Sequence, residues 1–321
     1  ERGVLGPSPP PVAIAGSLPR TVNGYVLATI AVLLFSTSPT LMRFAPGIGP
    51  IEIAFWRLFT GAVAVRLFAL VSRHQIAWRR LITLEFVGYG ALVAVHFGSF
   101  VASLIFTSTA HSLAITYTAP AFVALMSWAF LHEPISRRAV IGIVVAISGA
   151  TYLTGFEPEV TARSLIGDGL ALVTAITFGV YSIAGRRARD HVPLYDYACG
   201  AYGWGAVWLL PFAVWEAPSA TRGLVPMLAV AAAGLFPLGI GHTLYNAALR
   251  RIPATGANVI AVFEVVGGTL LTALIFGEIP TTTSIVGACI LLTGIMVVVL
   301  DPAPHRGTID PQSPDPLAPT A

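Results

Sequence analysis

Two stretches of the sequence decide the fold of this chain: HEPISRRAVIGIVVAISGA (132–150) and GEIPTTTSIVGACILLTGI (277–295). In each stretch a short loop with a glutamate precedes an apolar run that carries two glycines seven residues apart. The four glycines are Gly142, Gly149, Gly287 and Gly294. Because one offset of 145 residues relates every matched pair, the pattern predicts two copies of one structural unit.

Further matches extend this repeat towards the beginning of each half. An offset of 143 residues aligns three earlier pairs, which are Phe35/Phe178, Arg43/Arg186 and Pro50/Pro193. We therefore expect a first repeat over 23–156 and a second over 157–300. The flanking segments 1–22 and 301–321 are rich in proline, and we expect them to be disordered tails.

The composition places the repeats in a membrane. Hydrophobic residues make up 55% of the 321 residues and charged residues only 10%, with a mean hydropathy of +0.80. Soluble domains carry about 25% charged residues, so a cytosolic enzyme, a nucleic-acid binder and a disordered protein are excluded. Cys199 and Cys289 lie in apolar runs far apart, so no disulfide framework is indicated.

The apolar runs between polar breaks are each long enough to span a bilayer, which needs about 20 residues. The fold class that we predict is an all-α membrane protein with ten transmembrane helices, arranged as two inverted five-helix repeats. The ten helices are expected near 23–43, 51–71, 82–104, 112–131, 139–156, 167–185, 194–215, 224–249, 254–277 and 283–300.

The arginines predict the orientation. All 18 basic residues are arginines, and thirteen of them fall in alternate breaks and in the two tails, against three in the other breaks. This positive-inside pattern predicts that both termini are cytoplasmic. Since five is an odd number of crossings, the second repeat enters the membrane in the opposite sense.

The chain resembles the drug/metabolite transporter superfamily, in particular its ten-helix EamA-type members. The resemblance rests on 51–62, 117–153 and 244–295 and covers both family repeats, roughly 23–300. Two segments depart from the family pattern: FSTSP (35–39) and Pro193-Leu194-Tyr195. The resemblance implies a small-molecule transporter of the bacterial inner membrane, often an exporter of amino acids or related metabolites.

Inverted repeats are common in secondary transporters, where they enclose a site near the membrane midplane. We therefore expect a carrier that moves an amino acid or related amphiphilic solute by alternating access, with export as the favoured direction. Uptake or exchange of another organic solute is the alternative. An intramembrane enzyme lacks support because no catalytic motif is present. We expect no cofactor and no metal, and as partners a small-molecule substrate, the lipid bilayer and candidate coupling protons, but no nucleic acid, with the chain a monomer or homodimer.

Glu264 is the clearest candidate for a transport residue. It lies ten residues into the ninth predicted helix, about 15 Å from its start and near the middle of the hydrocarbon layer. An ionisable group at that depth is costly and needs a reason. Glu264 could bind a substrate ammonium or carry a proton; the alternative is a hydrogen bond that joins helices.

Three further candidates are ionisable residues within predicted helices. His96 and His242 could relay protons or pack as neutral rings. Arg57 is predicted close to the outer surface, where it could pair with Glu52 or extend towards water. We expect a structural or gating role for Arg57 rather than contact with the substrate.

An aromatic and hydroxyl-lined pocket suits an amphiphilic solute of amino-acid size. The candidates for such a pocket are Phe35, Ser38, Tyr117, Thr118, Phe178, Tyr181, Tyr245 and Asn246. Structural or gating roles are expected for the matched loop glutamates Glu133 and Glu278 and for Pro39 and Pro120. These two prolines, together with Pro237, interrupt predicted helices and are candidate hinges.

Overall fold

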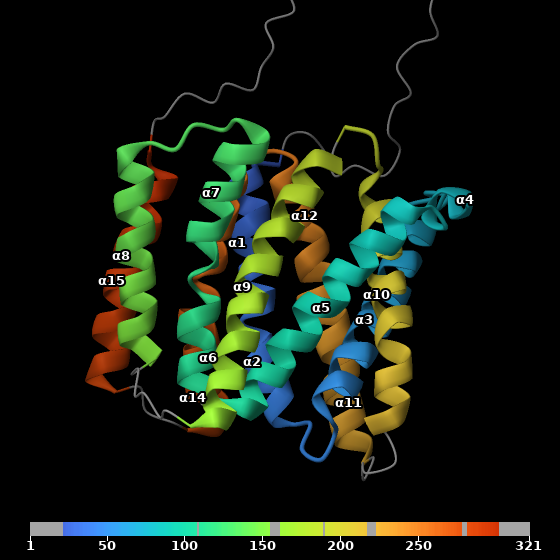
Figure 1. Ribbon diagram of the computed structural model, residues 1–321, viewed down its shortest axis with the longest axis horizontal. Helices are drawn as coiled ribbons and strands as arrows, with labels where there is room; N and C mark the ends of the chain where they lie inside the picture. Colours follow the sequence, from blue (N-terminus) through green and yellow to red (C-terminus); the bar gives the residue numbers. More distant parts are fainter. Residues whose placement is uncertain are drawn as a thin grey trace, which may run out of the picture.

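The structure, a computed structural model, describes residues 22–107, 109–154, 161–188, 190–216, 223–277 and 281–301. Every regular element in these ranges is a helix (Figure 1), which confirms the predicted all-α class. The first half contains α1 (Gly24–Phe35), α2 (Thr37–Arg43), α3 (Pro50–Val71), α4 (Trp78–Leu81), α5 (Leu84–Phe106), α6 (Thr109–Thr116), α7 (Ala119–Leu131) and α8 (Arg137–Thr154). The second half contains α9 (Ala162–Ala188), α10 (Leu194–Glu216), α11 (Leu224–Ala233), the π-helix η2 (Gly234–His242), α12 (Thr243–Leu249), α13 (Ala254–Ala261), α14 (Glu264–Phe276) and α15 (Thr282–Val299).

Within these described ranges, eight helical segments are long and apolar enough to cross a membrane. They are Gly24–Arg43, Pro50–Val71, Leu84–Phe106, Ala162–Ala188, Leu194–Glu216, Leu224–Leu249, Ala254–Phe276 and Thr282–Val299. The predicted helices 112–131 and 139–156, observed as α6–α7 and α8, are not among the eight. The large apolar side chains on the outer faces of the helices are widely exposed, for example Leu67, Phe212 and Leu274, as expected for a surface that faces lipid rather than water.

Four of the ten predicted helices are not continuous α-helices. The predicted helix 23–43 divides at Ser36, 112–131 divides after Thr116, and 254–277 divides after Ala261, while 224–249 contains η2. Three of these interruptions contain or adjoin a proline: Pro39, Pro120 and Pro237. Proline interrupts a helix because it lacks the backbone N–H donor and its ring crowds the preceding turn. The expected loop 72–80 also contains a short helix, α4, which the sequence did not predict.

The breaks in the fourth helix of each half occupy equivalent positions. Thr118 N–H donates to the Ile115 carbonyl at 3.0 Å, and Phe263 N–H donates to the Ile260 carbonyl at 2.9 Å. Both bonds span three residues instead of four, so the helix tightens locally at each break. The pairs are again 145 residues apart, and the same offset relates the helix ends at His132 and Gly277, which both adopt positive φ, 55° and 70°.

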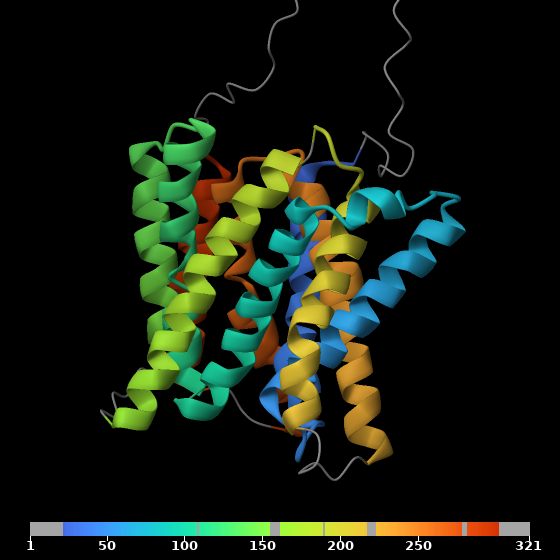
Figure 2. The ribbon, with the colours of Figure 1, turned by 45° about the vertical axis from the view of Figure 1, so that its right-hand side comes forward.

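The matched glycine helices α8 and α15 pack against each other along one edge of the bundle (Figures 1 and 2). A Cβ placed on Gly142 would lie 2.9 Å from the Gly294 carbonyl, and one on Gly149 would lie 2.9 Å from the Gly287 carbonyl. As the residue number rises along α8, it falls along α15, so the two helices are antiparallel. The absence of side chains at the four glycines lets the two backbones approach closely.

Side-chain contacts between loops define two ends of the bundle. At the first, which we call the arginine-rich end, contacts join Arg251 to Val22, Arg186 to Glu133, Ser136 to Asp301, His74 to Asp196 and His191 to Glu85. At the opposite end, contacts join Glu216 to Ile51 and Glu52, Thr107 to Asp168 and Arg163 to Ile105. Each of these contacts joins segments that the sequence places on the same side of the membrane.

Candidate functional site

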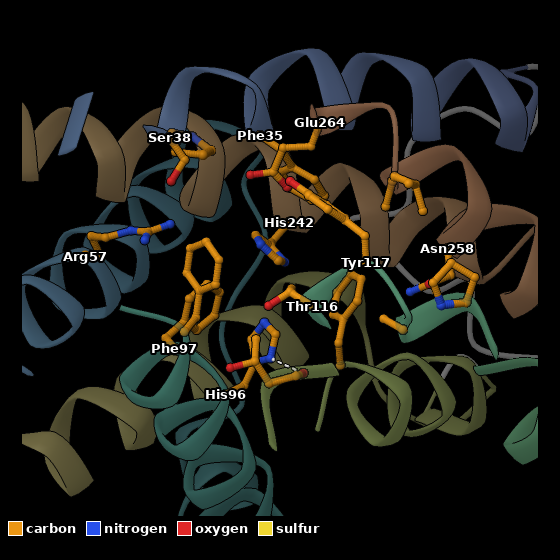
Figure 3. A pocket seen from close by; sticks show the side chains of 18 residues that line it. Phe35, Ser38, Arg57, His96, Phe97, Thr116, Tyr117, His242, Asn258 and Glu264 are labelled. Carbon is orange, nitrogen blue, oxygen red and sulfur yellow. Dashed lines mark hydrogen bonds between the residues drawn. The ribbon is translucent and has the colours of Figure 1, made fainter. Parts of the chain in front are cut away.

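A pocket in the middle of the bundle encloses a cavity of about 60 Å³, enough for about four water molecules. Helices from both halves form its walls: α1–α2, α3, α5 and the α6–α7 break from the first, and α9, η2 and the α13–α14 break from the second. The lining residues are Phe35, Ser38, Arg57, His96, Phe97, Phe100, Thr116, Tyr117, Ala119, Pro120, Thr174, Phe178, Pro237, His242, Asn258, Ala261, Val262 and Glu264 (Figure 3).

Arg57 lies in the wall of this pocket. Its side chain comes from α3 and is 2% exposed, so it does not extend to the outer surface as the sequence suggested. The guanidinium carbon lies 5.4 Å from the centre of the Phe97 ring, a cation–π contact. Within the described part of the chain, Nε and Nη1 of Arg57 have no hydrogen-bond partner. An arginine placed this way can bind an anionic group that enters the pocket.

Glu264 lies at the first residue of α14, directly after the break that follows α13. The N-terminal end of a helix favours negative charge because its N–H dipoles point towards it. Figure 3 shows Glu264 and Arg57 reaching the pocket from different helices. No hydrogen bond or ion pair joins Glu264 to another residue of the described chain.

The two histidines meet in the same pocket, although they are far apart in sequence. His96 Nδ1 lies 3.2 Å from the Thr174 carbonyl, and since a carbonyl can only accept, this nitrogen carries the hydrogen. The His96 ring stacks on Phe178 at 5.3 Å between centres. His242 packs against Phe35 at 4.3 Å, and its Nδ1 lacks a hydrogen-bond partner among the described residues.

The pocket gathers unpartnered polar atoms. Besides those of Arg57 and His242, they include Ser38 Oγ, Thr116 Oγ1 and Asn258 Oδ1. A buried polar atom without a partner costs free energy, and most structures avoid it. Several such atoms around one cavity indicate a surface built to bind a polar molecule.

Thr116 and Asn258 are site residues that the sequence analysis missed. Asn258 interrupts the apolar run ATGANVIAVFE (254–264) six residues before Glu264. The rule that singled out Glu264, a polar group deep in an apolar helix, would have identified Asn258 as well. Thr116 gave no comparable signal, because threonines are frequent in the neighbouring loop.

The structure brings ten of the predicted residues to the pocket wall: Phe35, Ser38, Arg57, His96, Tyr117, Pro120, Phe178, Pro237, His242 and Glu264. Other predicted residues lie elsewhere. Thr118 donates its hydroxyl to the Ile115 carbonyl at 2.6 Å, at the break between α6 and α7. Pro39 lies in α2 beside Gly268. Glu278 lies outside the described residues.

Tyr181, Tyr245 and Asn246 form a buried cluster one turn beyond the pocket, towards the arginine-rich end. Asn246 donates to the Tyr181 hydroxyl at 2.5 Å, and the Tyr245 hydroxyl lies 3.0 Å from Ser182 Oγ. Further along α9, Arg186 forms an ion pair with Glu133, with 2.7 Å between Nη2 and Oε1. This layer separates the pocket from the arginine-rich end.

Fold and site together define a polytopic helical membrane protein with a central pocket between two related halves. The model of the EamA-like transporter family matches the chain twice, over 22–155 and 165–300. The chain therefore belongs to the EamA-like transporter family of the drug/metabolite transporter superfamily, which confirms the resemblance noted in the sequence.

Two similar proteins carry names that describe transporters. The chain is 24% identical over 254 residues to the uncharacterised transporter YoaV of Bacillus subtilis, covering 78% of this chain and 87% of YoaV. It is 28% identical over 186 residues to a protein of Streptantibioticus cattleyicolor named a probable terminal-alkyne amino-acid exporter, covering 56% of this chain and 60% of that protein. A crystal structure shares the fold with a TM-score of 0.75 at 20% identity, covering 86% of this chain and 96% of that one.

Proposed function

We propose that this protein is a secondary transporter that moves a small amphiphilic solute of amino-acid type across the cytoplasmic membrane by alternating access, with export as its favoured direction. The observation that carries the proposal is the position of the pocket. It lies where the equivalent helix breaks of the two repeats, after Thr116 and after Ala261, approach each other. Interrupted helices at the interface of two repeats commonly form the substrate site of secondary transporters.

The proposal includes ten membrane crossings. Eight segments of the described chain meet the length and hydropathy of a span. We add α6–α7 and α8 as the fourth and fifth crossings, since α8 packs antiparallel along α15, one of the eight. Ten crossings also agree with the grouping of the loops at two ends of the bundle.

The same pair of helices supports an inverted relation of the repeats. A twofold axis in the membrane plane would exchange Gly142 with Gly287 and Gly149 with Gly294. Under this exchange, the contact between Gly142 and Gly294 becomes the contact between Gly287 and Gly149. The structure contains both contacts, as such an axis requires. The arginines place the first end in the cytoplasm together with both chain termini, by the positive-inside rule.

Alternating access needs a barrier that opens and closes on each side of the site. The cluster of Tyr181, Tyr245 and Asn246, with the Glu133–Arg186 pair beyond it, supplies the barrier towards the arginine-rich end. These contacts join α9 to α12 and to the loop that follows α7, so they must part when the site opens to that side. Because both halves of one chain line the pocket, a monomer provides a complete pathway.

The chemistry of the pocket indicates the class of substrate, an amino acid or related metabolite, and the name of one relative supports it. Charged, hydroxyl and aromatic side chains line the same cavity, a combination that suits an amino acid or a related metabolite. The relative from Streptantibioticus cattleyicolor has a name that specifies amino-acid export. An uptake or exchange carrier for another small organic solute is the second candidate, and protons are the candidate coupling ion.

Counterflow in proteoliposomes tests the proposal. The purified full chain is reconstituted, the vesicles are loaded with an unlabelled amino-acid mixture, and trace labelled amino acids are added outside. A carrier accumulates label transiently, whereas protein-free liposomes do not. Failure to exchange any amino acid or small organic metabolite contradicts the proposal, and chemical alteration of a bound lipid instead would indicate an intramembrane enzyme.

A further inference from the structure

The pocket holds one strong cation and one carboxyl group, on different helices and facing the same cavity. Arg57 comes from α3 of the first repeat and Glu264 from α14 of the second. No ion pair joins the two side chains. Figure 3 shows both side chains at the cavity, with Arg57 at the left of the view and Glu264 above His242. The cavity therefore has a basic pole at Arg57 and an acidic pole at Glu264.

We propose that Arg57 and Glu264 together select a zwitterionic substrate, an amino acid with an apolar side chain, whose carboxylate binds Arg57 and whose ammonium binds Glu264. This rests on the proposed transport function and specifies the substrate class of the same site. It also assigns to Arg57 a role in binding that differs from the structural role suggested by its position in the sequence.

The environment of Arg57 calls for an anion. The side chain is 2% exposed, and two of its nitrogens have no hydrogen-bond partner in the described ranges. A guanidinium presents a planar set of donors that matches a carboxylate through two parallel hydrogen bonds. The contact with Phe97 holds the guanidinium plane without using its donors.

The environment of Glu264 calls for a cation. The side chains of Phe35 and Tyr117 lie beside it in Figure 3, and Ser38 lines the same cavity. Aromatic faces attract cations, and Ser38 Oγ, 3% exposed and without a partner among the described residues, can accept a hydrogen bond. An ammonium placed here meets the carboxylate, a hydroxyl oxygen and ring faces at once.

The rest of the cavity is apolar. Phe97, Phe100 and Phe178 line it, and Pro120, Ala261 and Val262 add aliphatic surface. This wall can pack against a hydrocarbon or aromatic side chain, whereas a third charge on the ligand would have no counterpart. The lining therefore favours amino acids such as phenylalanine and leucine over lysine or glutamate, and the cavity of about 60 Å³ must widen to take them.

The selection follows from charge balance. A zwitterion pairs with both poles, while an amine leaves Arg57 unpaired and an acid leaves Glu264 unpaired. Hydrogen bonds between charged groups contribute enough that losing one weakens binding by about tenfold to a hundredfold. The same apolar side chain carried on an amine or on an acid should therefore bind markedly more weakly than on the amino acid.

The test compares three matched solutes by thermal shift of the purified full chain, since a ligand raises the melting temperature according to its affinity. The probes are L-phenylalanine, phenethylamine and hydrocinnamate, with L-leucine, isoamylamine and isocaproate as a second set. We expect the amino acid to bind about tenfold or more tightly than its amine or its acid. Equal binding of the three solutes, or binding of none while counterflow moves another metabolite, overturns this inference and leaves the transport function standing.

Two variants assign the poles. Arg57→Gln should abolish the difference between phenylalanine and phenethylamine, and Glu264→Gln should abolish the difference between phenylalanine and hydrocinnamate. Arg66→Gln, on the same helix as Arg57 but outside the pocket wall, and Glu85→Gln are the matched controls and should keep both differences. Retention of both differences in the two pocket variants contradicts the assignment. Should Arg57→Gln fail to fold, the comparison of solutes on the unaltered chain decides the question.

Discussion

At the scale of single residues, Glu264 carries the clearest expectation for transport. Glu264→Gln keeps the shape of the side chain and removes its charge, so the chain should fold while flux falls by about tenfold to a hundredfold. Any pH dependence of flux that arises from this carboxyl should also disappear. The measurement is counterflow at several pH values, with Glu85→Gln as the control outside the pocket. Unchanged flux with unchanged pH dependence would remove Glu264 from the mechanism.

The sequence identified residues of this site by one rule, that a polar group inside an apolar helix needs a reason. Glu264, His96 and His242 followed from it, and the structure places all three at the pocket. The rule gives depth along a helix but not the direction in which the side chain points. For that reason Tyr245 was assigned to a pocket wall that it does not form. Arg57 was assigned to the surface from its depth, six residues into the predicted helix, yet its side chain lines the pocket.

At the scale of elements, the glycines of α8 and α15 make a prediction about stability. A Cβ on Gly149 would meet the backbone nitrogen of Leu291, which cannot move without shifting α15. Gly149→Ala should therefore destabilise the protein by about 1–3 kcal/mol. Gly169→Ala is the matched control, because a Cβ there has no neighbour within 4 Å; it should be neutral or stabilise α9 by up to about 1 kcal/mol.

Denaturant unfolding in detergent micelles measures both glycine variants. Equal stability of Gly149→Ala and Gly169→Ala would contradict the close packing of α8 on α15.

The break between α6 and α7 predicts an effect on the rate of transport. Pro120→Ala restores a backbone donor at the second residue of α7 and should let the helix run through the break. If the break is a hinge, flux should fall roughly tenfold, the change expected from about 1.4 kcal/mol on the conformational step. Pro211→Ala is the control, since Pro211 lies inside the continuous helix α10. Unchanged flux in Pro120→Ala would contradict the hinge.

The breaks show what periodicity leaves out. Hydropathy predicts one continuous transmembrane helix for an apolar run such as 254–277. It cannot detect a break in which a single helical turn changes its hydrogen bonding. Proline indicated the interruptions near Pro39, Pro120 and Pro237, but the break after Ala261 contains no proline. It becomes visible only through its equivalence to the break after Thr116, which required the helix bounds of both halves.

At the scale of the whole molecule, the proposed topology predicts which loops face each side of the membrane. In a chain with Cys199→Ala and Cys289→Ala, His191→Cys at the arginine-rich end should react with a membrane-impermeant thiol reagent only from the cytoplasmic side. Thr282→Cys, at the start of α15, should react only from the outside. Both positions are exposed. Labelling of the two cysteines from the same side would refute the inverted arrangement.

The central claim is that one pocket between the two repeats is reached from the two sides of the membrane in turn. The most direct measurement places a single thiol there, as Ser38→Cys in the same cysteine-free chain, and follows its reaction with an impermeant reagent from each side of sealed vesicles. The account predicts reaction from both sides, slowed from both by the solute that supports counterflow. Reaction from one side only, or a rate that this solute leaves unchanged, would contradict it.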